Sequence, residues 1–260
     1  MISINNVERF RARLKAGQIC VGGSVTLIDP LVSEVVAEAG NDFVWIETEH
    51  SHLNLPAVMA HILALRGTHV APIVRVPWND PILLKPVLDM APAGIVIPMV
   101  RSPEEARNAV AACRYPPEGI RGFGPIRNMY GMESITEYLD KANTQILIFI
   151  QIEHIDAVRS LDEILAIPGL DGIVLGRMDL SGSMGKLGQN NDPEVVEAID
   201  TIFSKTKDAG LYIGVSIGYD ADTVQDWRAK GVDWFELGEE KSYIYEGSKV
   251  IADAVHSLDR

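Results

Sequence analysis

The chain has 260 residues, 47% hydrophobic and 23% charged, a composition typical of one large globular domain or two small ones and not of a disordered chain. Its 23 Lys and Arg residues against 36 Asp and Glu residues give a formal net charge of −13, which repels phosphate backbones and anionic membrane surfaces. We therefore expect no nucleic acid and no membrane as partners.

The two cysteines and residues 1–15 indicate the cellular compartment in which the protein is expected. Cys20 and Cys113 are too few for a disulfide framework and form no CxxC pair, so they indicate a reducing environment and suggest no cysteine nucleophile. Residues 1–15, MISINNVERFRARLK, carry charges where a secretion signal needs an apolar stretch. The apolar run 93–100 is far shorter than the roughly 20 residues that span a bilayer. We expect a cytoplasmic protein.

Short runs rich in β-branched and aromatic residues alternate with segments of helical periodicity along the chain. The runs predict strands at 18–25, 42–47, 71–76, 93–99, 145–153, 171–176, 211–217 and 232–238. The periodic segments predict helices at 29–39, 54–66, 80–90, 102–113, 155–166, 192–209 and 220–230. In the first helix, Asp29 is expected as the N-cap and Pro30 in the first turn.

Near-continuous apolar strands such as IVIP and ILIFI indicate burial on both faces, as in a parallel sheet covered by helices. With right-handed crossovers, the eight predicted βα units close a (β/α)8 TIM barrel, a single α/β domain over residues 1–260. The alternative is an open doubly wound sheet. It is disfavoured because no GxGxxG follows the first strand and no Walker sequence is present.

Two segments fall outside the repeated unit. Residues 113–131, rich in Gly, Pro, Arg and Tyr, lie in an insertion between the fourth and fifth strands and predict a shaped loop. Residues 242–258 carry an apolar stripe at helical spacing. This C-terminal helix either packs on its own barrel as the eighth helix or docks onto another subunit as an oligomerisation helix.

In such a barrel, reactive groups belong at the carboxyl ends of the strands. Glu153 and Asp179 follow the fifth and sixth strands, and adjacent carboxylates repel each other unless a proton or a cation lies between them. Oxygen-only ligation favours Mg²⁺ or Mn²⁺ and leaves coordination positions for substrate and water. For either acid alone, an ion pair with an arginine or a helix cap is the alternative.

The second and third strands end in a second group of polar residues. His50, three residues after Glu47, could be oriented by that carboxylate as a general base, although a solvated histidine is the alternative in this histidine-rich region. Arg75 could recognise a carboxylate or stabilise an oxyanion, or form a structural ion pair.

After the sixth strand, the turn 176–185 could cradle an anion with its backbone N–H groups, or be a plain turn in which Asp179 caps a helix. No predicted strand end carries Lys, so a Schiff-base mechanism has no obvious candidate.

Longer motifs connect these residues to a known family. WIETEH, VRVP, KPVLDMAPAGIVIPMV, EEARNAVAACRYPPEGIRGFGP, QIEHIDAVRSLDEILAIPGLDGIVLG and DLSGSMG, spread over roughly residues 5–240, resemble the HpcH/HpaI family of metal-dependent, class II pyruvate aldolases. The combination of YPPEGIRG, QIE and the DLS turn is more specific than any single signal. The sequence departs from the usual DGEH at Glu47 to His50, from the usual GPxDL at Arg177, and from LDxG at Ala91-Pro92.

The resemblance implies a role for each matching residue. The divalent metal would be Mg²⁺, Mn²⁺ or Co²⁺, the substrate a small 2-oxo acid with an aldehyde, and the assembly a hexamer built as a trimer of dimers that exchange the last helix. The implied residues are Glu153 and Asp179 as metal ligands, His50 as the base oriented by Glu47, Arg75 at the keto oxygen, Gln151 with the backbone of Gly176, Met178 and Asp179 at the carboxylate, and Asp89 at a subunit contact near the site.

The expected reaction is reversible aldol cleavage of a 4-hydroxy-2-oxo acid to pyruvate or a related 2-oxo acid and an aldehyde, with a metal-stabilised enolate and with His50 taking the C4 hydroxyl proton through water. Two alternatives stay open. One is another metal-dependent lyase or decarboxylase that forms an enolate, from the phosphoenolpyruvate/pyruvate barrel group. The other is a catalytically silent, metal-dependent protein that binds carboxylates.

Overall fold

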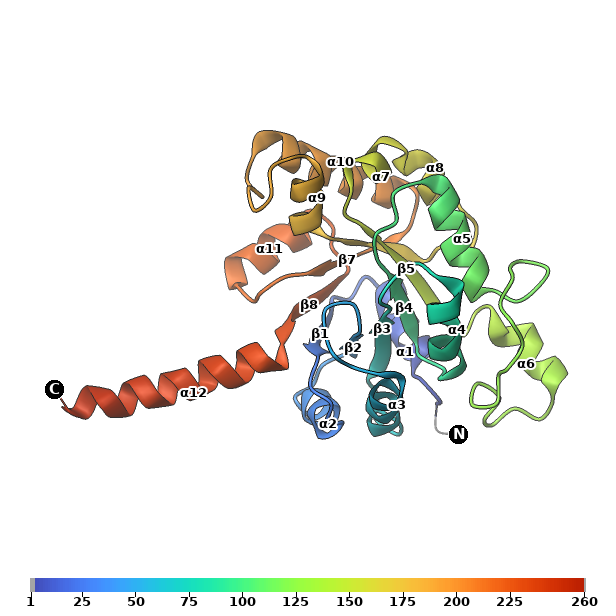
Figure 1. Ribbon diagram of the computed structural model, residues 1–260, viewed down its shortest axis with the longest axis horizontal. Helices are drawn as coiled ribbons and strands as arrows, with labels where there is room; N and C mark the ends of the chain where they lie inside the picture. Colours follow the sequence, from blue (N-terminus) through green and yellow to red (C-terminus); the bar gives the residue numbers. More distant parts are fainter. Residues whose placement is uncertain (1–2, 260) are drawn as a thin grey trace.

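The computed structural model describes residues 3–259 and contains a closed barrel of eight parallel strands in sequence order, as the sequence predicts (Figure 1). The strands are β1 (Cys20–Val25), β2 (Phe43–Glu47), β3 (Ala71–Arg75), β4 (Gly94–Ile97), β5 (Leu147–Ile152), β6 (Gly172–Leu175), β7 (Tyr212–Ser216) and β8 (Trp234–Glu239). Seven strands lie inside their predicted ranges, and β8 ends one residue beyond the predicted 232–238.

The barrel interior is apolar at its amino end. The Trp234 ring lies 4.9 Å from Phe149 and 5.3 Å from Phe43, measured between centroids. Helix α1 (Val7–Lys15), which the sequence analysis did not predict, places Phe10 5.6 Å from Phe43. Because α1 joins this core through its buried apolar face, it closes the amino end and leaves substrate access to the carboxyl end.

The outer helices begin as their sequences predict. Side chains of Asn54, Ser102 and Asp192 accept first-turn N–H groups, and proline occupies the first turn of the helices that follow. The outer helices that match predicted segments are α2 (Leu31–Glu38), α3 (Leu55–Ala64), α4 (Pro81–Asp89), α5 (Pro103–Cys113), α10 (Pro193–Asp208) and α11 (Ala221–Ala229). Pro30, not Asp29, is the N-cap of α2, although the Asp29 carboxylate still accepts the N–H of Leu31 at 3.0 Å.

Two other helical predictions need correction. The single helix expected at 155–166 is divided into α7 (Ile155–Arg159) and α8 (Leu161–Leu165), because Ser160 leaves helical geometry with φ −109° and ψ 20°. The segment expected as a turn after β6 forms a short helix, α9 (Arg177–Ser183), with Gly176 as its N-cap. Asp179 therefore lies inside the first turn of α9 and does not cap it.

Tight packing in the barrel depends on Gly214 of β7. A Cβ at this position would lie 2.2 Å from the Trp234 ring, which other apolar side chains hold in place. We expect Gly214→Ala to lower the free energy of unfolding by about 1 to 3 kcal/mol through overpacking, measured by urea denaturation. Gly247→Ala is the matched control, because a Cβ there meets nothing within 4 Å. Equal destabilisation by both changes would contradict this account of the barrel core.

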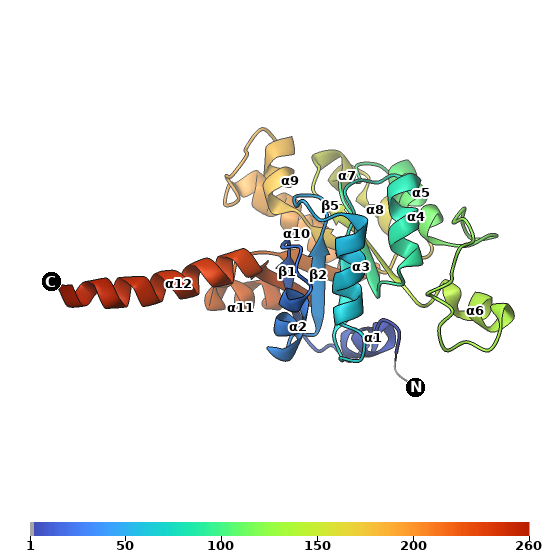
Figure 2. The same ribbon diagram turned by 60° about the horizontal axis from the view of Figure 1, so that its bottom comes forward.

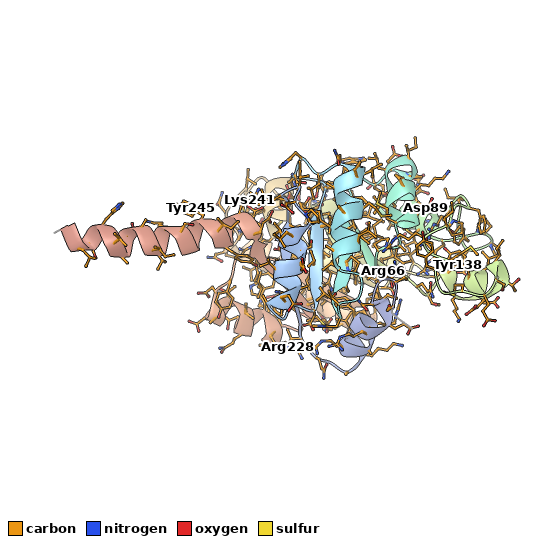
Figure 3. All side chains as sticks on the ribbon, turned by 90° about the horizontal axis from the view of Figure 1, so that it is seen from below. Arg66, Asp89, Tyr138, Arg228, Lys241 and Tyr245 are labelled. Atoms are coloured by element: carbon orange, nitrogen blue, oxygen red, sulfur yellow. The ribbon has the colours of Figure 1, made fainter. Side chains whose placement is uncertain are left out.

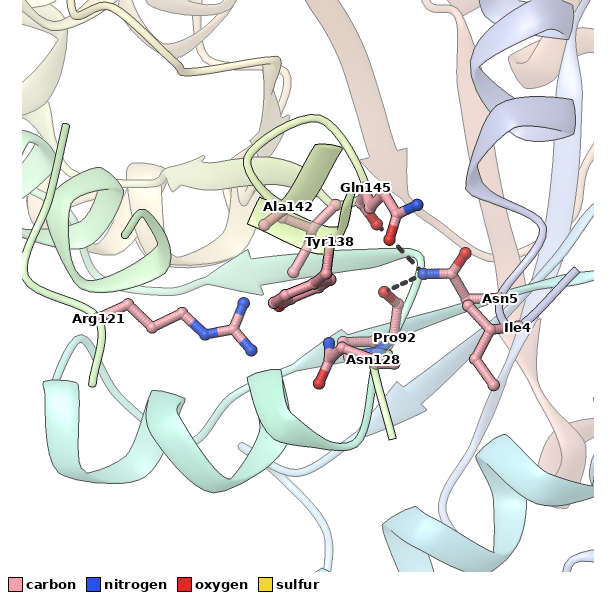
Figure 4. A pocket seen from close by; sticks show the side chains of 10 residues that line it. Ile4, Asn5, Pro92, Arg121, Asn128, Tyr138, Ala142 and Gln145 are labelled. Atoms are coloured by element: carbon pink, nitrogen blue, oxygen red, sulfur yellow. Dashed lines mark hydrogen bonds between the residues drawn. The ribbon is translucent and has the colours of Figure 1, made fainter. Parts of the chain in front are cut away.

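The insertion between α5 and β5 is mostly irregular, as predicted for 113–131, and then forms α6 (Ile135–Ala142). Tyr138 of α6 is buried and donates its hydroxyl to that of Tyr115 at 3.1 Å, which holds the loop together. A cavity of about 10 Å³ lies here, beside Asn5, whose amide donates to the carbonyls of Pro92 and Gln145 (Figure 4). It has room for about one water molecule and not for a substrate.

Helix α12 (Glu240–His256) extends away from the barrel with the C-terminus at its far end (Figures 1 and 2). Glu240 at its base is its one buried residue, whereas Ile244, Val250 and Ile251 are 58 to 67% exposed. The alternative in which this helix packs on its own barrel is therefore wrong for this chain. None of the described helices is long and apolar enough to cross a bilayer.

Candidate active site

A cavity of about 470 Å³ opens at the carboxyl ends of the strands. Its lining combines carboxylates, serines, one amide and two arginines, a polar mixture that an apolar barrel core would not select. Of the predicted site residues, those that line it are Glu47, His50, Arg75, Gln151, Glu153, Gly176, Met178 and Asp179. The fold thus brings together residues from four βα units that are distant in sequence.

Glu47 is buried at the end of β2, where it organises the turn that follows. One carboxylate oxygen accepts the indole N–H of Trp45 at 2.8 Å and the Nε–H of Arg75 at 2.6 Å. The other accepts the backbone N–H groups of Glu49 at 2.6 Å and His50 at 2.9 Å. Glu47 therefore fixes Arg75 and the backbone that carries His50.

The prediction that Glu47 orients the His50 ring needs correction. Glu47 contacts the backbone of His50, whereas the ring nitrogen Nε2 lies 3.8 Å from Glu49 Oε2. The His50 side chain is 70% exposed at the cavity mouth, so it is accessible to substrate but loosely held. The sequence analysis assigned no role to Glu49, because this residue lies two positions beyond the end of β2.

Arg75 is held on several sides. Nη1 donates to Gln151 Oε1 at 3.1 Å and lies 3.2 Å from Glu49 Oε2, and the guanidinium stands over the Trp45 ring at 5.4 Å. The ion pair that the sequence allowed for Arg75 is therefore present, and Arg75 also lines the cavity. Its recognition of a substrate group stays a prediction. Its Nη2 has no hydrogen-bond partner among residues 3–259 and is not enclosed, so this nitrogen is available to a ligand.

Glu153 lies just beyond β5 with its side chain buried. Its carboxylate accepts the backbone N–H of Met99 and the side-chain amide of Gln151, both at 2.6 Å. Burial raises the pKa of Glu153 to about 7, and the nearby charges of Glu49 and Asp179 add to the rise. The protein therefore stabilises the charged form of this carboxylate less well than water does.

Gly176 is required beside Glu153, since a Cβ on residue 176 would lie 2.3 Å from Glu153 Oε2. The next three residues, Arg177, Met178 and Asp179, form the first turn of α9, where a helix offers no internal acceptors for backbone N–H groups. Their N–H groups are thus suited to an anion, as the sequence predicts for this segment. Asp179 itself is exposed to the cavity.

The residues present fit a divalent cation. Burial raises the pKa of Glu49 to about 7, although Arg75 Nη1 lies 3.2 Å from its buried Oε2. The charges of Glu49, Glu153 and Asp179 influence one another, and such a set of hard oxygen donors suits Mg²⁺ or Mn²⁺. Between residues 3 and 259, no group of three or more His, Cys, Asp or Glu side chains is arranged as a complete metal site.

Asp89 is not brought to this cavity. It ends α4 at the opposite end of the barrel, pairs with Arg121 at 3.0 Å, and lies on the side of the molecule that carries Tyr138 (Figure 3). The two cysteines are also remote from the chemistry. Burial raises the pKa of Cys20 to about 11 and that of Cys113 to about 12, so neither supplies a thiolate near neutral pH.

The closed barrel and the charged cavity at its carboxyl end have the arrangement of a (β/α)8 barrel enzyme. The chain belongs to the HpcH/HpaI aldolase/citrate lyase family, whose profile matches residues 25–245. It is 36% identical to a hydroxypyruvate/pyruvate aldolase from Roseovarius nubinhibens, over 88% of this chain and 89% of that one. It is also 36% identical to a 5-keto-4-deoxy-D-glucarate aldolase from Escherichia fergusonii, over 95% and 96% of the two chains.

Solved structures agree with this assignment. The citrate synthase SbnG superimposes with a TM-score of 0.87 at 31% identity, covering 99% of this chain and 100% of that one. An HpcH/HpaI aldolase from Desulfitobacterium hafniense DCB-2 gives a TM-score of 0.84 at 30% identity, covering 93% and 95%. These proteins therefore share the barrel fold with this chain over nearly its whole length.

Proposed function

We propose that this protein catalyses the reversible aldol cleavage of a 4-hydroxy-2-oxo acid to pyruvate, or a related 2-oxo acid, and an aldehyde. The proposal rests on one observation: Arg75 and Glu153 line the same cavity. Glu47 and Gln151 fix the Arg75 guanidinium, and the protein only partly stabilises the negative charge of the Glu153 carboxylate. Family membership and two aldolase relatives at 36% identity support it.

In this proposal, each residue has a defined task. The first-turn N–H groups of α9 and the Gln151 amide bind the substrate carboxylate, and Arg75 faces the keto oxygen. His50 accepts the C4 hydroxyl proton through water while the C3–C4 bond breaks. The electron pair of the C3–C4 bond moves into the enolate, and the aldehyde leaves. Protonation of the enolate at C3 then gives the methyl group of pyruvate. A divalent cation, Mg²⁺, Mn²⁺ or Co²⁺, held by Glu153 and Asp179 would supply positive charge to the keto and carboxylate oxygens.

The test is an assay with several 4-hydroxy-2-oxo acids and each of the three metals, with EDTA-treated protein as the control. We expect metal-dependent release of pyruvate and aldehyde in equal amounts, together with solvent exchange of pyruvate methyl protons followed by NMR. Exchange without aldehyde release from any substrate would favour a different enolate reaction, a candidate that similarity to the citrate synthase SbnG keeps open. Neither exchange nor cleavage would favour a silent carboxylate-binding protein.

We also propose that α12 is an oligomerisation helix. Its exposed Ile244, Val250, Ile251 and Val255 would be covered by another subunit, in a hexamer built as a trimer of dimers. In that assembly Asp89 of one subunit would lie near the active site of another, a role it does not have within one chain. A single domain over 1–260 and a cytoplasmic location remain predictions.

A further inference from the structure

The cavity wall formed by β7, β8 and β1 carries polar side chains that the proposed mechanism does not use. Ser24, Ser216 and Glu236, here called the serine–glutamate cluster, all line the cavity. The three strands are neighbours in the barrel, and Ser216 pairs directly with Glu236 in the strand register. Glu236 is 4% exposed, whereas Ser216 is exposed to the cavity.

The hydrogen bonds of the cluster leave capacity for a ligand. Glu236 accepts the hydroxyl of Ser216 on one oxygen and the N–H of Gly238 at 2.9 Å on the other, and Ser24 lines the same cavity. A carboxylate has about four acceptor positions, and each serine oxygen keeps lone pairs after donating its proton. The cluster therefore offers several acceptors to the cavity.

The charge and burial of the cluster narrow the kind of group that fits. A second carboxylate would be repelled by Glu236. A cationic group is not offered by the substrates of the proposed reaction, which are a 2-oxo acid and an aldehyde. An alkyl group would displace water from buried acceptors without replacing its hydrogen bonds. A neutral hydroxyl group can donate a hydrogen bond to these acceptors without bringing a second charge into the cavity.

We propose that the serine–glutamate cluster binds a hydroxyl group of the substrate and makes the enzyme selective for hydroxylated substrates over their deoxy analogues. The inference rests on the proposed aldol reaction and adds the substrate class and the residues that select it. A site built to hydrogen-bond a substrate hydroxyl rejects an analogue without it far more strongly than an apolar pocket distinguishes substrates by size.

The experiment compares matched pairs in the condensation direction with the metal-loaded enzyme. Hydroxypyruvate and pyruvate are compared as donors with one aldehyde, and glycolaldehyde and acetaldehyde as acceptors with pyruvate. We expect kcat/KM to favour the hydroxylated member of at least one pair by about tenfold or more, and Ser216→Ala to remove about tenfold of that preference. Glu236→Gln, which keeps the side-chain shape, is expected to reduce the same ratio.

Ser204→Ala is the control, because Ser204 is exposed on α10 away from the cavity and its change should leave the ratio intact. An active enzyme with no preference in either pair, or with a preference unchanged in both cluster variants, overturns the inference while the aldolase function stands. If no pair reacts, the proposed function fails. Calorimetric dissociation constants for hydroxypyruvate and pyruvate, in the wild type and Ser216→Ala, then decide the inference, and equal affinities overturn it.

Discussion

Arg75→Lys should lower turnover by about 10² to 10³, the usual effect of losing one preorganised donor at a developing oxyanion, and should weaken substrate binding much less. The guanidinium reaches Glu47 through Nε and Gln151 through Nη1 while Nη2 stays available to substrate. Lysine keeps the positive charge but has one nitrogen, so it cannot serve these partners and the growing charge of the enolate oxygen in the same geometry.

Steady-state kinetics and exchange of pyruvate methyl protons check this prediction, since both reactions pass through the enolate. Arg107→Lys is the control, because Arg107 is exposed on α5 away from the cavity. Thermal unfolding of both variants separates a catalytic loss from a structural one. Near-wild-type rates in both assays for Arg75→Lys would remove Arg75 from the chemistry and leave it only the ion pair with Glu47.

The barrel was predictable because its strands are buried on both faces. Such burial selects uninterrupted β-branched runs like GIVI in β4, and eight predicted βα units leave few alternatives to closure. The short helix α9 was harder to predict, because the Gly and Ser residues of 176–185 resemble a turn. The position of α12 was not decidable from its apolar stripe, since the stripe has the same appearance whichever subunit covers it.

Within the site, motifs predicted which residues line the cavity better than how they contact one another. The spacing between Glu47 and His50 suggested a contact between side chains, but the chain turns after β2 and presents backbone N–H groups to the carboxylate. Glu236 and Ser216 lie in two predicted strands near their ends, but neither belongs to the motifs that the sequence analysis singled out. The direct pairing of β7 with β8 places both at the cavity wall.

The largest expected effect on metal binding is that of Glu153→Gln. The carboxylate is buried, accepts hydrogen bonds from Met99 and Gln151, and lies within the electrostatic influence of Glu49 and Asp179. Neutralising it removes a predicted ligand and also relieves repulsion among these acids in the metal-free protein. We expect metal affinity to fall by at least about 10² and aldol activity to be lost.

Direct titration of Mn²⁺, followed by electron paramagnetic resonance, measures that affinity without relying on activity. Without metal, the unfolding temperature of Glu153→Gln should be no lower than that of the wild type, since the relieved repulsion offsets one weakened hydrogen bond. Glu163→Gln, at an exposed acid on α8, is the matched control and should change neither quantity. Undiminished Mn²⁺ binding by Glu153→Gln, or full turnover of the EDTA-treated wild type, would exclude Glu153 as a metal ligand and leave the two arginines of this cavity as its source of positive charge.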